Sequence, residues 1–151
     1  MTEEMDPDGP PDGEALTDPN ECLLRPCHHG FVHRGVPSEQ AFRLASNDAK
    51  RLSTMRGSMT TAKAACEARL ALGKTPAGTW GVSVEEAGNA GVPAYGDGGL
   101  RNNPPEHASC YFGGKDRMEQ YAAAELLAVA AEARGCLYPY KQGRAANSWS
   151  P

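Results

Sequence analysis

The chain has 151 residues, of which 40% are hydrophobic, and its formal net charge is −4. This length suits one domain, since domains commonly contain about 100–200 residues. No apolar run approaches the roughly 20 residues that a membrane-spanning helix needs, and the start of the chain lacks the basic and apolar regions of a secretory signal. We therefore expect a soluble, cytoplasmic protein with no membrane partner.

The acidic charge is concentrated at the start of the chain. Residues 1–20 hold seven of the 19 acidic residues and no lysine or arginine. They contain few large apolar side chains, so burial cannot offset the entropy that ordering would cost. The sequence predicts a disordered acidic leader over residues 1–20, a single domain over 21–140 and a flexible tail over 141–151. The domain shows no dense basic patch, so a nucleic-acid partner is not expected.

In the first half of the domain, the sequence predicts short elements followed by one helix. Strand-like composition begins near Cys22 and returns at residues 30–32. Ser38 can cap a helical turn that ends at Phe42, because its hydroxyl can accept a hydrogen bond from the first amides of the turn. Residues 62–72 are strong helix formers with threonine ahead and glycine behind, which predicts the first main helix.

The second half alternates strands with loops. Residues 78–84 place large apolar side chains at every second position, which predicts a half-buried strand. Residues 93–105 are rich in glycine, asparagine and proline and predict a loop, after which residues 107–112 resume strand composition. Residues 136–140 predict a closing edge strand, in which Pro139 limits ladder pairing.

The second main helix has the clearest ends. Asp116 can cap its start, Glu119 stands where a capping box needs it, and Gly135 supplies the stop. The side chains at helical spacing that we expect to pack on a sheet are Met118, Tyr121, Ala122, Val129, Ala130 and Ala133. Together these elements predict an α+β fold, with a small mixed or antiparallel sheet packed by two main helices.

A cluster of thiols and imidazoles near the start of the domain could supply the ligands of a structural zinc ion. It consists of Cys22, Cys27, His28, His29 and His33. Because no second cysteine pair follows at a regular distance, ordinary hydrogen-bonded or solvent-facing histidines explain these residues as well, and we assign no metal ligand. The five cysteines are an odd number and fit unpaired thiols in a reducing compartment.

Two common catalytic motifs are missing. No glycine-rich loop runs from a strand into a helix that starts with Lys-Ser or Lys-Thr, which disfavours hydrolysis of nucleoside triphosphates. Ser83 and Ser109 lack the flanking glycines of a nucleophile elbow, so the sequence does not predict a serine hydrolase triad.

Four short motifs resemble a widespread family of small uncharacterised bacterial proteins. They are L-R-P-C-H at 24–28, S-E-Q-A-F-R at 38–43, L-S at 52–53 and P-E-H-A at 105–108, and Asp48 also matches the family pattern. The resemblance covers roughly residues 23–138 and implies a bacterial protein without implying an activity. The chain departs from the family pattern at His29 and Leu44, where the family has proline, and at Cys110, where it has aspartate.

The polar residues that this resemblance matches are the candidate site. We expect Arg25, His28, Ser53 and His107 to be catalytic and Ser38 and Asp48 to bind a cofactor of unknown identity. A more distant similarity to ADP-ribosyltransferase-like domains implies that Arg25 pairs with a phosphate and that Ser53 orients a ribose or the catalytic residue. It also implies that His107 hydrogen-bonds the ribose or acts as general acid–base. The late glutamate of many such enzymes has no visible counterpart apart from Glu106.

The sequence thus favours a polar pocket that binds a nucleotide or another anionic small molecule, and it leaves enzymatic activity open. One alternative is a non-enzymatic accessory or immunity-type protein whose acidic leader contacts a basic protein partner. A second alternative is a small zinc-stabilised module. His107 itself has two interpretations, as part of a functional pocket or as a core histidine with satisfied hydrogen bonds.

Overall fold

The computed structural model describes residues 9–45 and 48–141, and the fold is α+β. A seven-stranded sheet has the order β1-β7-β8-β5-β2-β6-β9, and its described strand pairs are all antiparallel. Its strands are β1 (Glu14–Ala15), β2 (Cys22–His28), β5 (Arg51–Arg56), β6 (Pro76–Ser83), β7 (Ala94–Gly96), β8 (His107–Tyr111) and β9 (Tyr138–Pro139). A separate hairpin joins β3 (Val32–His33) to β4 (Val36–Pro37).

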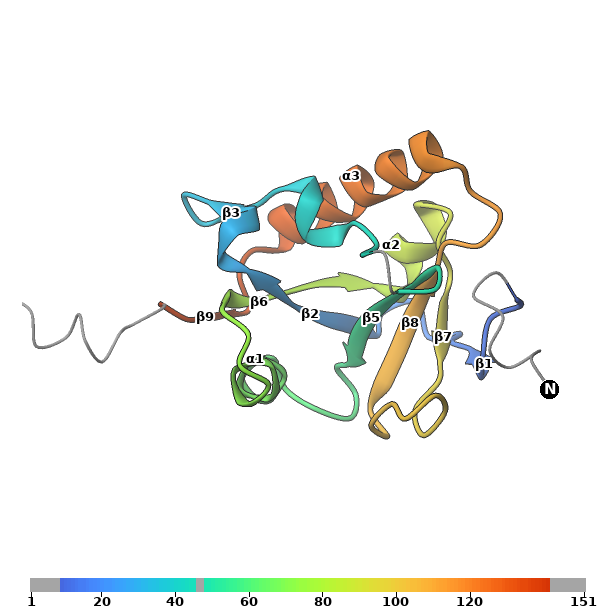
Figure 1. Cartoon of the computed structure of the whole chain (residues 1–151), viewed down its shortest axis with the longest axis horizontal. Helices are drawn as coiled ribbons and strands as arrows, with labels where there is room; N and C mark the ends of the chain where they lie inside the picture. The colour runs from blue at the N-terminus through green and yellow to red at the C-terminus, as the bar shows by residue number, and fades with distance from the viewer. Residues whose placement is uncertain (1–8, 46–47, 142–151) are drawn as a thin grey trace, which may run out of the picture.

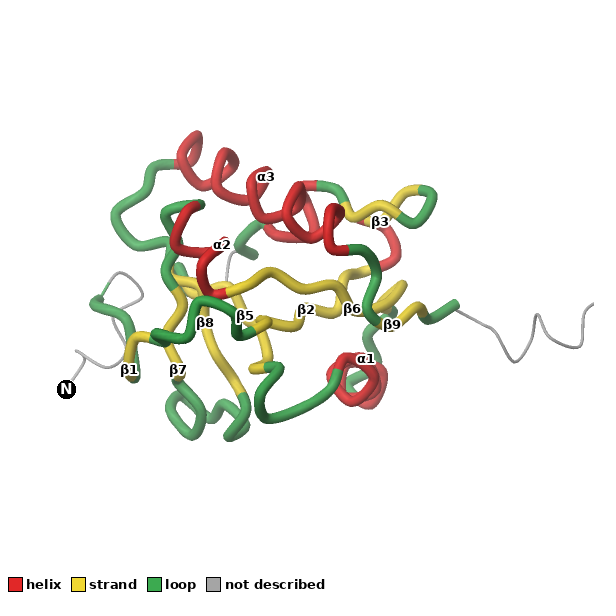
Figure 2. Tube along the Cα trace, turned by 180° about the vertical axis from the view of Figure 1, so that it is seen from behind, coloured by secondary structure: helices red, strands yellow, loops and turns green. Residues whose placement is uncertain are grey.

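The sheet lies between helices (Figures 1 and 2). The longest helix, α3 (Arg117–Arg134), covers one face together with the 3-10 turn η3 (Glu39–Phe42), whereas α1 (Ala62–Ala71) lies on the opposite face. The short helix α2 (Val84–Asn89) follows β6, and a second 3-10 turn, η2 (His29–Phe31), follows β2. In the described part of the chain, no helix is both long and apolar enough to cross a bilayer.

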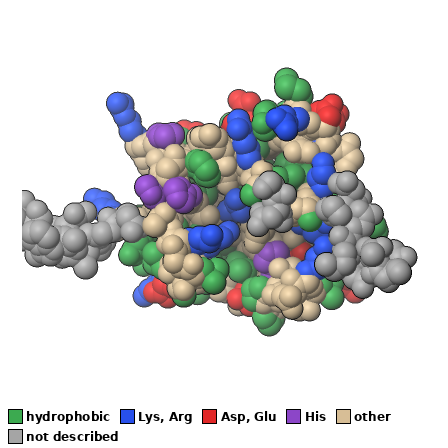
Figure 3. All heavy atoms as spheres, in the orientation of Figure 1, with side chains coloured by type: hydrophobic (Ala, Val, Ile, Leu, Met, Phe, Trp, Pro, Cys, Tyr) green, Lys and Arg blue, Asp and Glu red, His purple; other side chains and the backbone are tan. Residues whose placement is uncertain are grey.

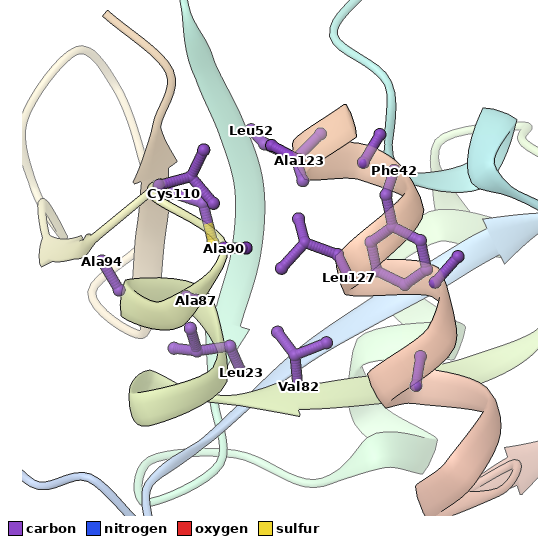
Figure 4. Close-up of a cluster of buried hydrophobic side chains, with 14 of the residues drawn as sticks. Leu23, Phe42, Leu52, Val82, Ala87, Ala90, Ala94, Cys110, Ala123 and Leu127 are labelled. Atoms are coloured by element: carbon purple, nitrogen blue, oxygen red, sulfur yellow. The ribbon is translucent and has the colours of Figure 1, made fainter. Parts of the chain in front are cut away.

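The hydrophobic core fills the space between the sheet and α3 (Figure 4). Leu23, Leu52 and Val82 project from three strands of the sheet toward Leu127 of α3 and Phe42 of η3. These five side chains are almost fully buried, and each buried side chain of this size stabilises the fold by about 1.5–3 kcal/mol. The core therefore fixes which way alternate residues of β2, β5 and β6 point.

The ends of α3 are as the sequence predicts, but its buried face is not. Asp116 and Glu119 form the capping box, and Gly135 follows the last turn. The residues packed on the sheet are Ala123, Ala124, Leu127, Ala128 and Ala131, whereas the expected Met118 and Val129 are 75% and 58% exposed. The helix carries apolar residues almost all round, and the alanine-rich stripe allows the closest approach to the sheet.

Three strand predictions also need correction. Residues 78–83 lie in β6, whereas Val84 begins α2, and β6 is buried on both faces because α1 and α3 cover it from opposite sides. The predicted loop over residues 93–105 contains β7, which is only three residues long. The predicted strand at residues 30–32 begins as η2, since the His28 side chain accepts a hydrogen bond from Gly30 N and caps a turn there.

Part of the predicted acidic leader lies against the sheet. Residues 1–8 are outside the described part of the chain, as is most of the predicted tail, but β1 at Glu14–Ala15 pairs with β7. Leu16 packs against the core, and Asp12 forms ion pairs with Arg51 and Arg101. Composition predicts disorder because one leucine buries little area. The backbone pairing and ion pairs that order this segment depend on distant residues.

Candidate functional site

Strands β2 and β5 separate into a fork, which is the main irregularity of the sheet (Figure 1). They pair only at Leu23 with Arg56 and at Leu24 with Met55. Beyond these two pairs β2 follows β6 and β5 follows β8. The two strands therefore leave a gap between them at the end where β2 reaches His28.

Arg25 links the two sides of the fork where the ladder has ended. Its Nη1 donates to the carbonyl oxygen of Ser53 at 2.8 Å, and its Nε donates to the carbonyl oxygen of Ala41 at 2.7 Å. Burial lowers the pKa of Arg25 from its ordinary value, mainly because the charged guanidinium is removed from water. Arg25 is thus a partly buried structural cation that fixes the backbone of Ser53.

A cavity of about 590 Å³ occupies the open end of the fork. Its walls come from β2, from η3 and the residues after it, and from the segment between α1 and β6. The polar side chains that line it belong to Arg25, His28, Gln40, Arg43, Asp48, Ser53, Arg69, Lys74 and Thr75. Four of these side chains are cationic and one is acidic, so the cavity is electropositive. Figure 3 shows lysine and arginine side chains gathered across the middle of this face.

Ser53 and His107 meet because alternate strand residues point to opposite faces. Leu52 points into the core under α3, so Ser53, the next residue, points to the other face. Ala108 is likewise in the core, and its neighbour His107 points away from it. Since Met55 pairs with His107 and Ser53 with Ser109, the two side chains are diagonal neighbours across β5 and β8. Ser53 Oγ lies 2.7 Å from His107 Nε2.

Asp97 completes a chain of three side chains. It follows β7, and its Oδ1 lies 2.6 Å from His107 Nδ1 while its Oδ2 accepts a hydrogen bond from Ser109 Oγ at 2.6 Å. Asp97 is 1% exposed and His107 6% exposed. A carboxylate at Nδ1 holds the proton on that nitrogen, so Nε2 is left to accept the hydroxyl proton of Ser53. The order is carboxylate, imidazole, hydroxyl, with the hydroxyl nearest the cavity.

The turn between β7 and β8 brings Asp97 beside His107. Gly98 packs directly on the returning chain, where a Cβ atom would lie 2.0 Å from the carbonyl oxygen of Pro105. Any side chain at this position would push the two strands apart. The absence of a side chain at Gly98 therefore keeps the carboxylate within hydrogen-bonding distance of the imidazole.

The structure gathers most of the predicted site residues. Arg25, His28, Asp48 and Ser53 line the cavity, and His107 lies behind Ser53 and reaches the cavity through it. Ser38 is elsewhere: it begins η3, and its hydroxyl donates to the carbonyl oxygen of Phe31 at 2.8 Å instead of capping the turn.

Sequence reasoning missed four residues of the site: Asp97, Ser109, Arg69 and Lys74. Asp97 follows a strand too short to show a pattern, inside a segment whose composition indicates a loop. A search for a nucleophile elbow could not find Ser53, because an elbow lies at a turn between a strand and a helix. Ser53 lies in the middle of a strand. For Ser109, the signal available in the sequence was its place two residues after His107 in a predicted strand, which puts both side chains on the same face.

The cysteine–histidine cluster does not form a metal site in the described residues. Cys22 and Cys27 are five residues apart on β2, so their side chains point to opposite faces of the sheet. Burial raises the pKa of the Cys27 thiol to about 12. No three of the described histidines, cysteines and acids are placed to hold a metal ion together.

Comparisons of the chain with models of protein families, with curated proteins and with solved structures find no significant match. Function is therefore inferred from the geometry of the cavity and of the side chains that border it.

Proposed function

We propose that this protein binds an anionic small molecule, such as a phosphate-bearing nucleotide, in the cavity between β2 and β5. The observation that supports this proposal is the set of cationic side chains that separate elements contribute to one cavity wall with a single acid, Asp48. The volume of about 590 Å³ falls within the roughly 300–1,000 Å³ typical of small-molecule sites.

Three of the cations lie close enough to influence one another or the same ligand. Arg69, in the last turn of α1, lowers the pKa of the partly buried Arg25, and Asp48 acts in the opposite direction. Lys74 lines the same wall and is exposed. Like charges gathered in one cavity repel, and a bound anion relieves that repulsion. An arginine also matches the two oxygens of a phosphate or carboxylate.

Arg43 contributes less to the positive charge of the cavity than the other three cations. It forms an ion pair with Glu39 on the same turn, and its guanidinium lies 4.1 Å from the ring centroid of Tyr121. The proposal therefore assigns ligand contacts to Arg69 and Lys74, and assigns Arg25 to holding the backbone beneath the ligand.

Thermal unfolding in the presence of phosphate, pyrophosphate, AMP, ADP or NAD⁺ tests the proposal, with adenosine as the uncharged control. A ligand that binds only the folded state raises the melting temperature. We expect at least one anion to raise it and adenosine to leave it unchanged. Preference for NAD⁺ over ADP would favour the ADP-ribosyltransferase-like interpretation of the sequence.

Two variants locate the site by isothermal titration with the anion that binds. Arg69→Gln and Lys74→Gln should each weaken binding by roughly tenfold, which corresponds to about 1.4 kcal/mol. Lys63→Gln is the matched control, because Lys63 is exposed on α1 and outside the cavity wall. If no anion changes the melting temperature, or if Lys63→Gln weakens binding as much as Arg69→Gln, the proposal is wrong.

A further inference from the structure

We infer that Ser53 is a nucleophile, that His107 is its general base and that Asp97 orients His107, so that the protein hydrolyses a small ester through an acyl-Ser53 intermediate. The choice of an anionic ester as substrate rests on the proposed function above. The assignment of Ser53 as nucleophile does not depend on it.

The atoms that meet are those that acyl transfer requires. The hydroxyl contacts Nε2 of the imidazole and the carboxylate contacts Nδ1. This arrangement lets one nitrogen accept a proton while the other stays bonded to a negative charge that stabilises the resulting imidazolium. The same constellation occurs on unrelated folds, so neither a nucleophile elbow nor a particular chain order is needed.

Burial and access are distributed as a catalytic serine needs them. Asp97 and His107 are almost fully buried, which protects their hydrogen bond from water and strengthens it. Ser53 is half-buried and lines the cavity. The chain of hydrogen bonds therefore ends on a hydroxyl that a substrate in the cavity can reach.

Ser109 and Arg25 hold this group in place without touching the substrate carbonyl. Ser109 donates to the second oxygen of Asp97, which fixes the plane of the carboxylate. Arg25 donates to the carbonyl oxygen of Ser53 and so fixes the backbone that carries the nucleophile. Both are positioning residues, since catalysis requires the reacting groups to be held in a narrow range of geometry.

The reaction proceeds in two balanced steps. Ser53 Oγ attacks the carbonyl carbon of the ester as its proton passes to His107 Nε2, and the bond to the alcohol oxygen breaks as Nε2 returns that proton to the departing alkoxide. Water then attacks the acyl-Ser53 ester, again losing a proton to Nε2, which passes it to Ser53 Oγ as the carboxylic acid leaves. One ester and one water give one acid and one alcohol.

Covalent labelling tests the nucleophile directly. A fluorophosphonate, which phosphonylates activated serines and releases fluoride, should add one group to the native protein, and peptide mass spectrometry should locate it on Ser53. The adduct should be absent in Ser53→Ala, and labelling of His107→Gln should be slower by about 10²–10⁴-fold. Ser58→Ala is the control that should label like the unmodified chain, because Ser58 is an exposed serine outside the cavity.

The result with the unmodified chain needs no variant and decides the inference by itself. An adduct on another residue, or no adduct under conditions in which the protein is folded by circular dichroism, would overturn the assignment of Ser53. If anions still bind in that case, the proposed function survives and only the catalytic inference is lost.

Hydrolysis of 4-nitrophenyl acetate and of the charged 4-nitrophenyl succinate tests the substrate class. We expect a lower KM for the succinate ester, and we expect Arg69→Gln to reduce the ratio of the two KM values several-fold. If Ser53 is labelled and both esters are hydrolysed with equal KM, the anionic substrate class is wrong while the nucleophile stands, and the unfolding and titration experiments with anions decide the proposed function separately.

Discussion

Arg56 and Glu21 form a two-point ion pair at the closed end of the fork. Nε and Nη2 of Arg56 lie 2.9 and 3.0 Å from Oε2 and Oε1 of Glu21. Glu21 immediately precedes β2 and Arg56 ends β5, so this pair fastens the two strands just where their short ladder begins. The side chain of Glu21 is 4% exposed, which makes the pair one of the more buried ionic contacts described.

The Glu21 pair predicts a pH dependence of stability. Hydrogen bonds from Arg56 lower the pKa of Glu21 from its ordinary value of 4.5, so in acid the unfolded chain binds a proton more readily than the folded chain. The stabilisation that this ion pair gives is therefore complete above pH 4.5, and it is lost as the pH falls through the folded-state pKa of Glu21. Glu21→Gln should cost roughly 1–3 kcal/mol at pH 7 and progressively less below pH 4.5. Urea unfolding across pH 3–7 measures this, with Glu67→Gln on α1 as the control substitution.

His107 is expected to support stability as well as catalysis. His107→Ala leaves the buried carboxylate of Asp97 without its imidazole partner, and an unsatisfied buried polar group costs roughly 1–3 kcal/mol. His33→Ala, on the exposed β3–β4 hairpin, should change the free energy of unfolding by less than about 0.5 kcal/mol. Denaturant unfolding of both variants gives the comparison, and equal losses would show that the hydrogen bond to Asp97 is not stabilising.

The cysteines are expected to react in order of exposure. Burial raises the pKa of the Cys27 and Cys110 thiols to about 12, whereas Cys136 is exposed and its pKa is raised less. Since the thiolate is the nucleophile, iodoacetamide at neutral pH should modify Cys136 in the folded protein and spare Cys27 and Cys110 until denaturant is added. Peptide mass spectrometry after timed quenching follows the order, and early modification of Cys27 would contradict the burial of β2.

Removal of residues 1–20 separates the sequence prediction from the structure. Composition predicts a leader with almost nothing to bury, whose deletion should leave unfolding unchanged. The structure instead pairs β1 with β7 and places Asp12 against Arg51, so we expect the deletion to cost roughly 1–3 kcal/mol and to lower the melting temperature by several degrees. Calorimetry of both chains decides, and identical melting curves would favour disorder of this segment.

Local signals predicted α1 and α3 well because caps act within a few residues. Thr61 and Asp116 accept from the amides three residues ahead, and Gly73 and Gly135 have the positive φ values that favour glycine after a helix. The face of α3 that packs on the sheet was not predictable in this way, since an apolar residue on every face leaves the choice to the partner surface.

The candidate site was only partly predictable for a related reason. Ser53 and His107 became candidates through the motifs of the family resemblance, but their contact depends on β5 and β8 being neighbours, and sequence position does not state strand order. Asp97 and Arg69 become visible only when the turn after β7 and the end of α1 are placed in space. Most of the expected residues do converge, but the orienting carboxylate came from an unexpected segment.

The sheet has its shortest internal strand pairing at the fork, between β2 and β5. Two residue pairs join β2 to β5, against seven between β2 and β6 and five between β5 and β8. The sheet thus consists of two stiffer halves that meet along a short seam, with the cavity at its open end and the Glu21–Arg56 pair at its closed end. Small rotations of one half against the other would change the width of the cavity and the distance from Ser53 to the cations across it. A molecule that touches both halves would resist that rotation, so slower exchange of amide hydrogens along the seam would report its arrival.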